Sequence, residues 1–443
     1  MDDFIAARSQ MAMSLGFHIV FACIGMVMPF FMATAHFIYL RTGNLLYRGL
    51  TQAWSKGVAI LFATGAVSGT MLSFELGLLW PTFMEHAGPI FGMPFSLEGT
   101  AFFIEAIALG FFLYGWDRLG RWFHWTTGLI VGISGLASGI LVVAANAWMN
   151  SPSGFDIVDG HYTNIDPIKA MFNDAWLSQA LHMTLAAFVA TGFAVSGIHA
   201  WMILKRKNVE FHTAAFRISA LTACLAAVLQ PISGDLSAKD VAERQPAKLA
   251  AMEAHFETQS HAPLLLGGVP DEDAETVRYA IKLPGMLSFL AHGDITAPVT
   301  GLKDLPREDR PPVAITHYAF QTMIVIGMLL VALALVYFTA LAKRRAHRNW
   351  LLRLFVVATP LGYIALEAGW VVTEVGRQPW IIHGVMRTAD AVTPMPGIVY
   401  SFYLFTAVFV SLSVTVAFLL YRQIKMVGKR YDVTDPDYQK DPI

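Results

Sequence analysis

The chain has 443 residues, of which 55% are hydrophobic and only 14% are charged, and its mean hydropathy is +0.52. A soluble domain carries about 25% charged residues, so this composition excludes an ordinary soluble protein and predicts that lipid covers much of the surface. The net charge of -1 argues against nucleic acid as a partner. The two cysteines, Cys23 and Cys224, exclude a disulfide framework, and neither stands in the Cys-x-x-Cys-His pattern that attaches a c-type haem.

Nine apolar segments are each long enough to span a bilayer, which takes about 20 residues. They predict an all-α fold, a polytopic bundle of nine transmembrane helices that forms a single membrane domain over residues 1–443. The first segment is too long for a signal peptide and follows the non-basic stretch MDDFIAAR, so we expect it to stay in the mature protein. The predicted helices cover residues 12–38, 55–80, 95–116, 123–147, 177–203, 214–231, 313–341, 351–375 and 396–421.

Basic residues predict the orientation of the bundle. Lys and Arg are concentrated in the short loops after the first, third, fifth and seventh predicted helices and in the C-terminal tail. The short loops on the other side carry only Lys169, Arg377 and Arg387, with Arg8 in the N-terminal segment. Because basic loops stay in the cytoplasm, we expect a multi-pass protein of the bacterial inner membrane with a periplasmic N-terminus and a cytoplasmic C-terminus.

One long polar segment interrupts the pattern, between the sixth and seventh helices on the outer side. Residues 232–312 carry charges of both signs and are rich in Pro and Gly. Such a segment is either a solvated excursion or a functional loop, and long loops are more often functional or mobile than inert. Residues 246–258 within it predict a short amphipathic helix.

Several ionisable side chains lie within the predicted spans, where each costs several kcal/mol and is a functional candidate. With the predicted orientation, five candidates from five different helices fall in the outer third of the bilayer, which favours one or more sites between helices near that face. These are His18, Glu98, His182, Met323 and Glu374. Haem iron accepts one His, or His with Met. There are two alternatives to haem binding. Each His could instead form a hydrogen bond between helices, and the carboxylates could belong to a proton-coupled transporter. The candidates are His18, Glu75, Glu98, Glu105, His182, Met323, Glu367 and Glu374.

Several long motifs in one order resemble subunit I of the cytochrome bd family of quinol oxidases. The most specific is Gly-Trp-Val-Val-Thr-Glu-Val-Gly-Arg-Gln-Pro-Trp at 369–380. The others are Glu-Gly-Thr-Ala-Phe-Phe-Ile-Glu at 98–105, Gly-Trp-Asp-Arg-Leu-Gly at 115–120, Ala-Asn-Ala-Trp-Met-Asn at 145–150 and Lys-Leu-Ala-Ala-Met-Glu at 248–253. The resemblance covers nearly the whole chain.

The resemblance implies three haems and their ligands. His182 and Met323 match the axial pair of a low-spin haem b (b558-like), which can only pass electrons because both axial positions are filled. His18 and Glu374 match single ligands of two high-spin haems, one a haem b (b595-like) and the other a haem d or a further haem b. Glu98 matches a carboxylate beside these two haems.

The resemblance also implies roles in proton and quinol chemistry. Lys248 and Glu253 match the quinol-oxidising residues of the outer loop, where a carboxylate can act as general base. Glu105 is expected to pass protons towards the oxygen site. Trp370 is expected to lie between haems as an aromatic neighbour, and Arg377 to pair with a haem propionate.

The sequence departs from the family pattern in two places. The outer loop is of the short type, and Gln321 stands where other members have an Arg, which leaves the potential of the low-spin haem open. The short loop and Ser-Phe-Glu-Leu-Gly-Leu-Leu-Trp at 73–80 look more like the cyanide-insensitive branch. The sequence leaves three points open. The third haem is either haem d or haem b, either His18 or Glu374 holds the oxygen-reducing haem, and the substrate is either ubiquinol or menaquinol.

The sequence therefore predicts the haem-bearing subunit of a terminal respiratory oxidase. It would oxidise quinol on the periplasmic side at the loop 232–312 and reduce O₂ to water with cytoplasmic protons, building a proton motive force without pumping. The expected partners are subunit II, membrane quinol and O₂, with a small single-helix subunit left open. The alternatives are a proton-coupled transporter, which predicts an internal repeat, and a cytochrome b that carries electrons without reducing oxygen.

Overall fold

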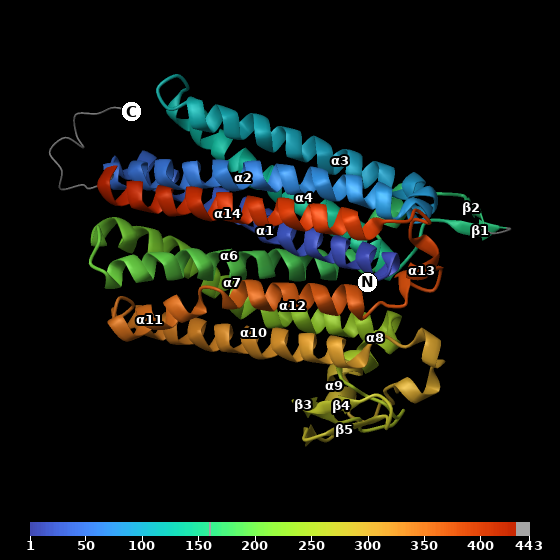
Figure 1. Cartoon of the computed structure of the whole chain (residues 1–443). Helices are drawn as coiled ribbons and strands as arrows, with labels where there is room; N and C mark the ends of the chain where they lie inside the picture. Colours follow the sequence, from blue (N-terminus) through green and yellow to red (C-terminus); the bar gives the residue numbers. More distant parts are fainter. Residues whose placement is uncertain (159–160, 431–443) are drawn as a thin grey trace.

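The structure is a computed structural model that describes residues 1–158 and 161–430; the tail, including the basic Lys440, lies outside the described residues. Within that range nine helices are long and apolar enough to cross a membrane, so the predicted all-α bundle is confirmed. They lie side by side with alternating direction (Figure 1). They are α1 (Asp3–Thr42), α2 (Leu45–Leu79), α3 (Pro81–Tyr114), α4 (Arg121–Asn150), α6 (Trp176–Leu204), α7 (Val209–Arg244), α10 (Val313–Ala342), the broken pair α11 (Asn349–Ala358) with α12 (Leu361–Val375), and α14 (Ile398–Arg430).

Several helix ends follow from local sequence. The Asp2 side chain accepts a hydrogen bond from the backbone N–H of Ile5 and caps α1. Gly43, with φ of 68°, closes that helix in a conformation that suits glycine, and Asn44 caps α2. Pro360 has no N–H to continue a helix, and the eighth span is divided there into α11 and α12. The single span predicted over 351–375 is therefore two helical pieces.

The sixth span is longer than predicted. Helix α7 continues past residue 231 to Arg244, so residues 232–244 of the predicted loop are helical. The polar residues after Pro231 lowered the hydropathy below that of a lipid-facing segment, although a helix can extend beyond the bilayer into water. The predicted helix over 246–258 is also shorter, because α8 ends at Met252.

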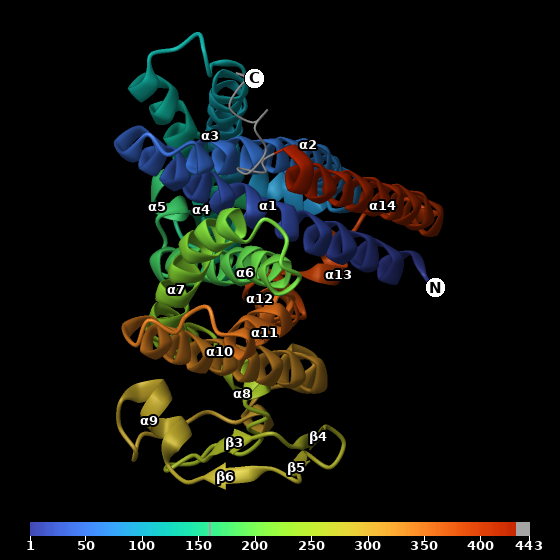
Figure 2. The ribbon, with the colours of Figure 1, turned by 90° about the vertical axis from the view of Figure 1, so that its left-hand side faces the viewer.

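The rest of the connection between α7 and α10 is also structured. It holds α8 (Pro246–Met252), α9 (Met286–His292), the 3-10 helices η1 (Leu302–Asp304) and η2 (Arg307–Asp309), and two antiparallel hairpin pairings. These pair β3 (Leu264–Leu266) with β6 (Ile281–Leu283) and β4 (Val269–Asp271) with β5 (Thr276–Arg278). Figure 2 shows this connection beyond α10, at one side of the bundle.

Smaller elements lie at the same end of the bundle as this connection (Figure 1). One hairpin pairs β1 (Asp156–Val158) with β2 (His161–Thr163), and another pairs β7 (Trp380–Ile382) with β8 (Met386–Arg387). The short helices there are α5 (Pro167–Met171) and α13 (Thr388–Ala391).

The apolar core is divided between two groups of helices. One cluster joins α1 to α2, α4 and α6, and a second joins α6 and α7 to α10 and α11. Small side chains let these helices approach closely: a Cβ added at Gly192 of α6 would lie 2.7 Å from the Cβ of Ala223 on α7. Helix α1 is thus packed against several other helices, and its buried polar side chains, Gln10, Ser14 and His36, face protein.

Candidate functional site

His18 lies on α1 against α2. Its Nδ1 is 2.9 Å from the hydroxyl of Ser68, and its ring occupies space that a side chain at Gly69 would fill, since a Cβ there would lie 2.9 Å from Cε1. In the described part of the chain no hydrogen bond is made by Nε2. An imidazole held through one nitrogen, with the other nitrogen free, is the usual arrangement of a metal-ligating histidine.

His182 and Met323 lie on neighbouring helices. His182 on α6 places Nδ1 3.1 Å from the hydroxyl of Ser233 on α7, and Gln230 donates to its backbone carbonyl. Met323 on α10 lies against α12, where a Cβ added at Gly369 would come within 3.0 Å of the sulfur. Each side chain is therefore oriented by an adjacent helix.

Glu374 and the buried Arg377 form an ion pair where α12 ends. Arg377 Nη2 donates to Glu374 Oε2 at 2.6 Å, and Asn146 of α4 donates to Glu374 Oε1 at 2.5 Å. Arg377 is only 2% exposed, and its Nε and Nη1 have no hydrogen-bond partner among the described residues. Buried guanidinium donors of this kind fit an anionic group such as a carboxylate. Trp370 packs against the apolar cluster that includes α1 and α6.

The two carboxylates predicted on one face of α3 both meet α4. The hydroxyl of Ser138 donates to Glu98 Oε1 at 2.9 Å. Glu105 is buried, and its carboxyl lies 3.3 Å from the position of a Cβ added at Gly135, one turn of α4 before Ser138. The α3–α4 contact therefore carries both carboxylates, as the seven-residue spacing predicted.

The other two carboxylates of the predicted spans have separate surroundings. Glu75 of α2 is buried and accepts a hydrogen bond from Gln10 Nε2 at 3.0 Å. Glu367 of α12 faces α1, with Oε2 3.3 Å from the Cβ position of Gly16. The structure thus distributes the candidates over several contacts with α1, α4 and α12. No hydrogen bond or ion pair joins His18, His182, Met323 and Glu374 to one another within the described residues.

Lys248 on α8 and Glu253, which directly follows that helix, are both buried, and burial shifts their pKa values in opposite directions. Desolvation, strengthened by the charge of Arg377 and opposed by that of Glu374, lowers the pKa of Lys248 to about 7. Desolvation raises the pKa of Glu253 to about 8. Glu253 Oε2 has no hydrogen-bond partner among the described residues, whereas Lys248 Nζ donates to Asn150 Oδ1 at 2.6 Å.

Helix α8 is held against the bundle from three sides. Asn150 of α4 binds Lys248 and also accepts from Gln245 Nε2 through its backbone carbonyl at 2.7 Å. His317 of α10 places Nδ1 2.8 Å from the carbonyl of Met252. A Cβ added at Gly376, just after α12, would lie 3.1 Å from Lys248 Cγ. Lys248 therefore lies against the end of the helix that carries Glu374.

The departure at Gln321 also has a defined position. Its Nε2 donates to the carbonyl of Leu265 at 3.1 Å, and its Oε1 accepts from the backbone N–H of Gly267 at 3.3 Å. Gln321 thus attaches the start of α10 to strand β3 of the outer connection.

The sequence prediction missed the polar residues that hold the candidates. Nothing in hydropathy or charge distinguishes Ser68, Ser138 or Ser233 from other small residues of the spans. Asn146 and Asn150 lie in the motif at 145–150, but no role was assigned to either. Their separation of four residues on one helix face, close to the outer end of α4, is the signal that was available.

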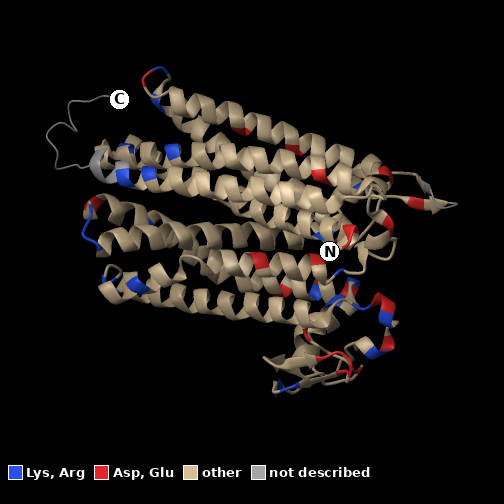
Figure 3. Cartoon of the chain, viewed as in Figure 1, with Lys and Arg blue, Asp and Glu red and all other residues tan. Residues whose placement is uncertain are grey.

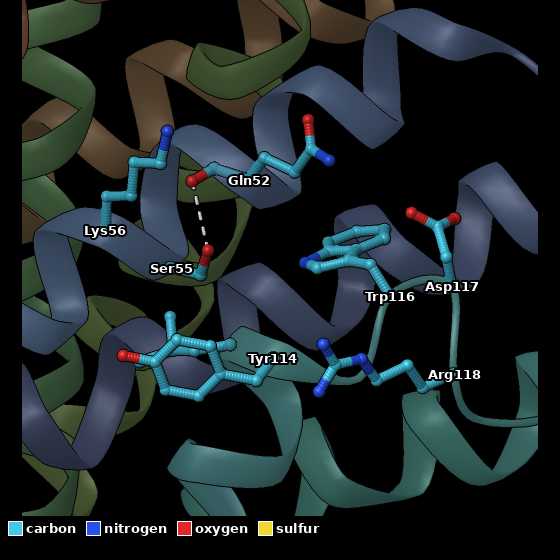
Figure 4. Close-up of a pocket in the computed structure, with 8 residues that line it drawn as sticks. Gln52, Ser55, Lys56, Tyr114, Trp116, Asp117 and Arg118 are labelled. Atoms are coloured by element: carbon cyan, nitrogen blue, oxygen red, sulfur yellow. Dashed lines mark hydrogen bonds between the residues drawn. The ribbon is translucent and has the colours of Figure 1, made fainter. Parts of the chain in front are cut away.

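A pocket of about 290 Å³ opens at the opposite end of the bundle. Figure 4 shows its lining residues, which come from the start of α2 and the loop after α3 and include Ser55, Lys56 and Asp117. No candidate site residue lines this pocket, so it is separate from the groups described above.

A membrane bundle that buries imidazole, thioether and carboxylate groups of haem-ligand type is typical of membrane-bound haem proteins that handle electrons. The cytochrome bd terminal oxidase subunit I family model matches residues 6–427, so the chain belongs to that family.

Relatives agree over almost the full length. The chain is 35% identical to a putative cytochrome bd menaquinol oxidase subunit I of Bacillus subtilis, over 95% of this chain and 96% of that protein. It is 29% identical to the cytochrome bd-II ubiquinol oxidase subunit 1 of Escherichia coli, over 87% and 88%. The solved bd oxidase from Geobacillus thermodenitrificans has a chain with 40% identity and a TM-score of 0.90, covering 96% of this chain and 99% of that one.

Family membership selects among the alternatives that the sequence left open. The chain is a subunit of a respiratory quinol oxidase of the inner membrane, with haem cofactors and quinol as substrate, and it works with subunit II. The transporter and the electron-carrying cytochrome b are set aside. Membership does not distinguish the cyanide-insensitive branch from the others.

Proposed function

We propose that this subunit oxidises quinol at the loop between α7 and α10 on the periplasmic side, and that O₂ is reduced to water with protons from the cytoplasm. Proton release on one side and uptake on the other then build a proton motive force without pumping. One observation carries the proposal: Lys248 of α8 lies against the end of α12, close to the charges of Glu374 and Arg377. Quinol and haem residues are thereby adjacent.

The proposed sidedness follows from charge. Lys and Arg predominate over Asp and Glu at the end of the bundle opposite to α8, whereas the connection that holds the hairpins carries charges of both signs (Figure 3). Because basic loops remain in the cytoplasm, α8 and the N-terminus are periplasmic and the C-terminus is cytoplasmic.

At the quinol site, Glu253 acts as the general base. A carboxyl whose pKa is about 8 exchanges its proton near neutral pH and suits removal of a proton from a quinol hydroxyl. Lys248, fixed through Asn150, supplies a positive charge for the quinol oxygen as that oxygen loses its proton.

The haem residues are assigned by their surroundings. His182 and Met323 would hold the low-spin haem b (b558-like). His18 and Glu374 would hold the two high-spin haems, of which one is b595-like and the other is haem d or haem b. When bound, these haems supply electron transfer and the iron that binds O₂. The free donors of Arg377 fit a propionate, and Trp370 is the aromatic neighbour.

Proton uptake is assigned to the α3–α4 contact. Glu105 lies deeper in the bilayer than Glu98, and the Ser138 hydroxyl that bonds Glu98 can both donate and accept. Glu105 would pass a proton towards Glu98 along this face. Subunit II, and a small single-helix subunit, would cover the remaining lipid-facing surface.

The first test is a reduced-minus-oxidised absorbance spectrum of the purified oxidase, with and without carbon monoxide. We expect a b-type band and a component that responds to carbon monoxide; a red chlorin band would indicate haem d rather than a third haem b. Glu98→Gln should weaken the high-spin signals and leave the low-spin signal intact. A featureless spectrum, or full activity of the variant with both haem classes unchanged, would contradict these assignments.

A further inference from the structure

Asn150 connects the candidate quinol loop to the transmembrane helices. It is the last residue of α4 and is 3% exposed. Its Oδ1 accepts from Lys248 Nζ at 2.6 Å and from Gln245 Nε2 at 3.3 Å, and its backbone carbonyl accepts from Gln245 at 2.7 Å. Its Nδ2 donates to Asn146, at 2.9 Å to the carbonyl and 3.0 Å to Oδ1. Both ends of the amide are therefore engaged, towards α8 on one side and along α4 on the other.

The hydrogen bonds continue from Asn146 to Glu374. Asn146 Nδ2 donates to Glu374 Oε1 at 2.5 Å, and the other carboxylate oxygen accepts from Arg377. An unbroken series thus runs from Lys248 through Asn150 and Asn146 to Glu374.

The direction of this series is fixed by chemistry. An ammonium group can only donate and a carboxylate can only accept, so both amides must turn their oxygen towards Lys248 and their nitrogen towards Glu374. Aligned amide dipoles between a cation and an anion polarise one another and strengthen each bond. Reversing either amide would place a nitrogen donor against the Lys248 ammonium, or an oxygen against the carboxylate.

Lys248 depends on this arrangement because it is buried. Its Nζ makes one hydrogen bond among the described residues, to Asn150, and a buried cation without that acceptor would be poorly solvated. Gln245, the residue that precedes α8, is hydrogen-bonded to the same asparagine and is thereby fixed in position. Asn150 therefore determines both where α8 begins and where the Lys248 ammonium lies.

We propose that Asn150 is a positioning residue of the quinol site, which holds the Lys248 ammonium in place for the quinol head group and ties that position to the Glu374 carboxylate. The inference rests on the proposed function, since it assumes that Lys248 acts on quinol. Asn150 need not touch the substrate; it acts through Lys248.

Two substitutions separate the two ends of the amide. Asn150→Ala removes the acceptor for Lys248 and the donor to Asn146. Asn150→Asp keeps acceptor oxygens for Lys248 and Gln245 but loses the donor to Asn146. For Asn150→Ala we expect the quinol KM to rise about 10-fold or more, the effect of losing a hydrogen bond to a charged group, with the low-spin spectrum unchanged. For Asn150→Asp we expect a KM within about 3-fold of the unsubstituted oxidase.

The matched control is Asn173, another buried asparagine on the same side of the bundle. Its Oδ1 accepts from the N–H of Ala175 and its Nδ2 donates to the carbonyl of Ala170, away from α8. Asn173→Ala should leave the quinol KM unchanged, which separates a specific effect from a general loss of stability.

A double substitution tests whether Asn150 acts through Lys248. Lys248→Met should raise the quinol KM, and adding Asn150→Ala to it should change KM no further. If the two effects multiply, or if Asn150→Ala alone leaves KM unchanged while Lys248→Met raises it, the inference is wrong and the quinol site stands. If Lys248→Met has no effect on KM, the quinol assignment fails and this inference fails with it.

Discussion

Two carboxyl groups on the outer side of the bundle, the half-buried Glu374 and the buried Glu253, have opposite surroundings. Both oxygens of Glu374 accept hydrogen bonds, from Asn146 and Arg377, and a full positive charge lies 2.6 Å away. Among the described residues, Glu253 Oε2 has no hydrogen-bond partner and Glu253 forms no ion pair. Glu374 is thus hydrogen-bonded through both oxygens and paired with a guanidinium, whereas desolvation raises the pKa of Glu253.

This difference separates two kinds of chemistry. A charged, oriented carboxylate is suited to ligate a cation or a metal, whereas a carboxyl of raised pKa is suited to gain and lose a proton. Glu374 lies on α12 and Glu253 directly follows α8, so one region of the protein holds both an ion-paired carboxylate and a carboxyl group of raised pKa. The substitutions below test each half of this contrast.

The largest effect is expected from removing the charge of Glu374. Glu374→Gln leaves the buried Arg377 guanidinium without its counter-charge, which costs about 3–5 kcal/mol, and removes the predicted haem ligand. We expect loss of one high-spin haem and of quinol oxidase activity, measured by absorbance spectra and oxygen consumption. The control is Asp309→Asn, which breaks a more exposed ion pair with Arg387 worth about 0–1 kcal/mol. Normal high-spin spectra in Glu374→Gln would show that this carboxylate is not a ligand.

The next effect concerns the titrating carboxyl. Glu253→Gln should lower quinol oxidation by about 10²–10⁴-fold, the usual contribution of a general base, while all haem signals remain. Glu257→Gln is the matched control, because Glu257 lies nearby in the same connection but is exposed and pairs with Lys303. Equal activity in the two variants would remove Glu253 from the proposed mechanism.

Much of this contrast could not be predicted from the sequence. The nine spans and the candidate side chains were predictable because lipid demands long apolar helices and makes each ionisable residue conspicuous. The extension of α7 to Arg244 was not, because a helix beyond the bilayer carries no apolar signal. The partners Asn146, Ser138 and His317 were also missed, since contacts between helices depend on rotation and depth, which hydropathy does not determine.

The pH dependence of quinol oxidation should report both α8 residues. Glu253, with a pKa raised to about 8, must lose its proton to act, so kcat/KM should rise with pH, by about tenfold per pH unit below the Lys248 pKa of about 7. Lys248, with a pKa lowered to about 7, must keep its proton, so kcat/KM should fall at higher pH. A maximum between these values is expected. Glu253→Gln should abolish the rise and Lys248→Met the fall; a profile that keeps both limbs in both variants would contradict the assignment.

The smallest effect is expected where α12 meets the neutral ligand candidate. Gly369→Ala places a Cβ 3.0 Å from the Met323 sulfur, closer than side chains normally approach, so Met323 must shift at a cost of about 0.5–1.5 kcal/mol. We expect an altered low-spin spectrum, unchanged high-spin signals and a loss of activity of less than about tenfold. Gly327→Ala, on α10 one turn beyond Met323 with no atom within 4 Å of its added Cβ, is the control. If both variants leave the low-spin spectrum unchanged, the contact with Gly369 does not hold Met323 in place, and this part of α12 does not contribute to the site of the low-spin haem.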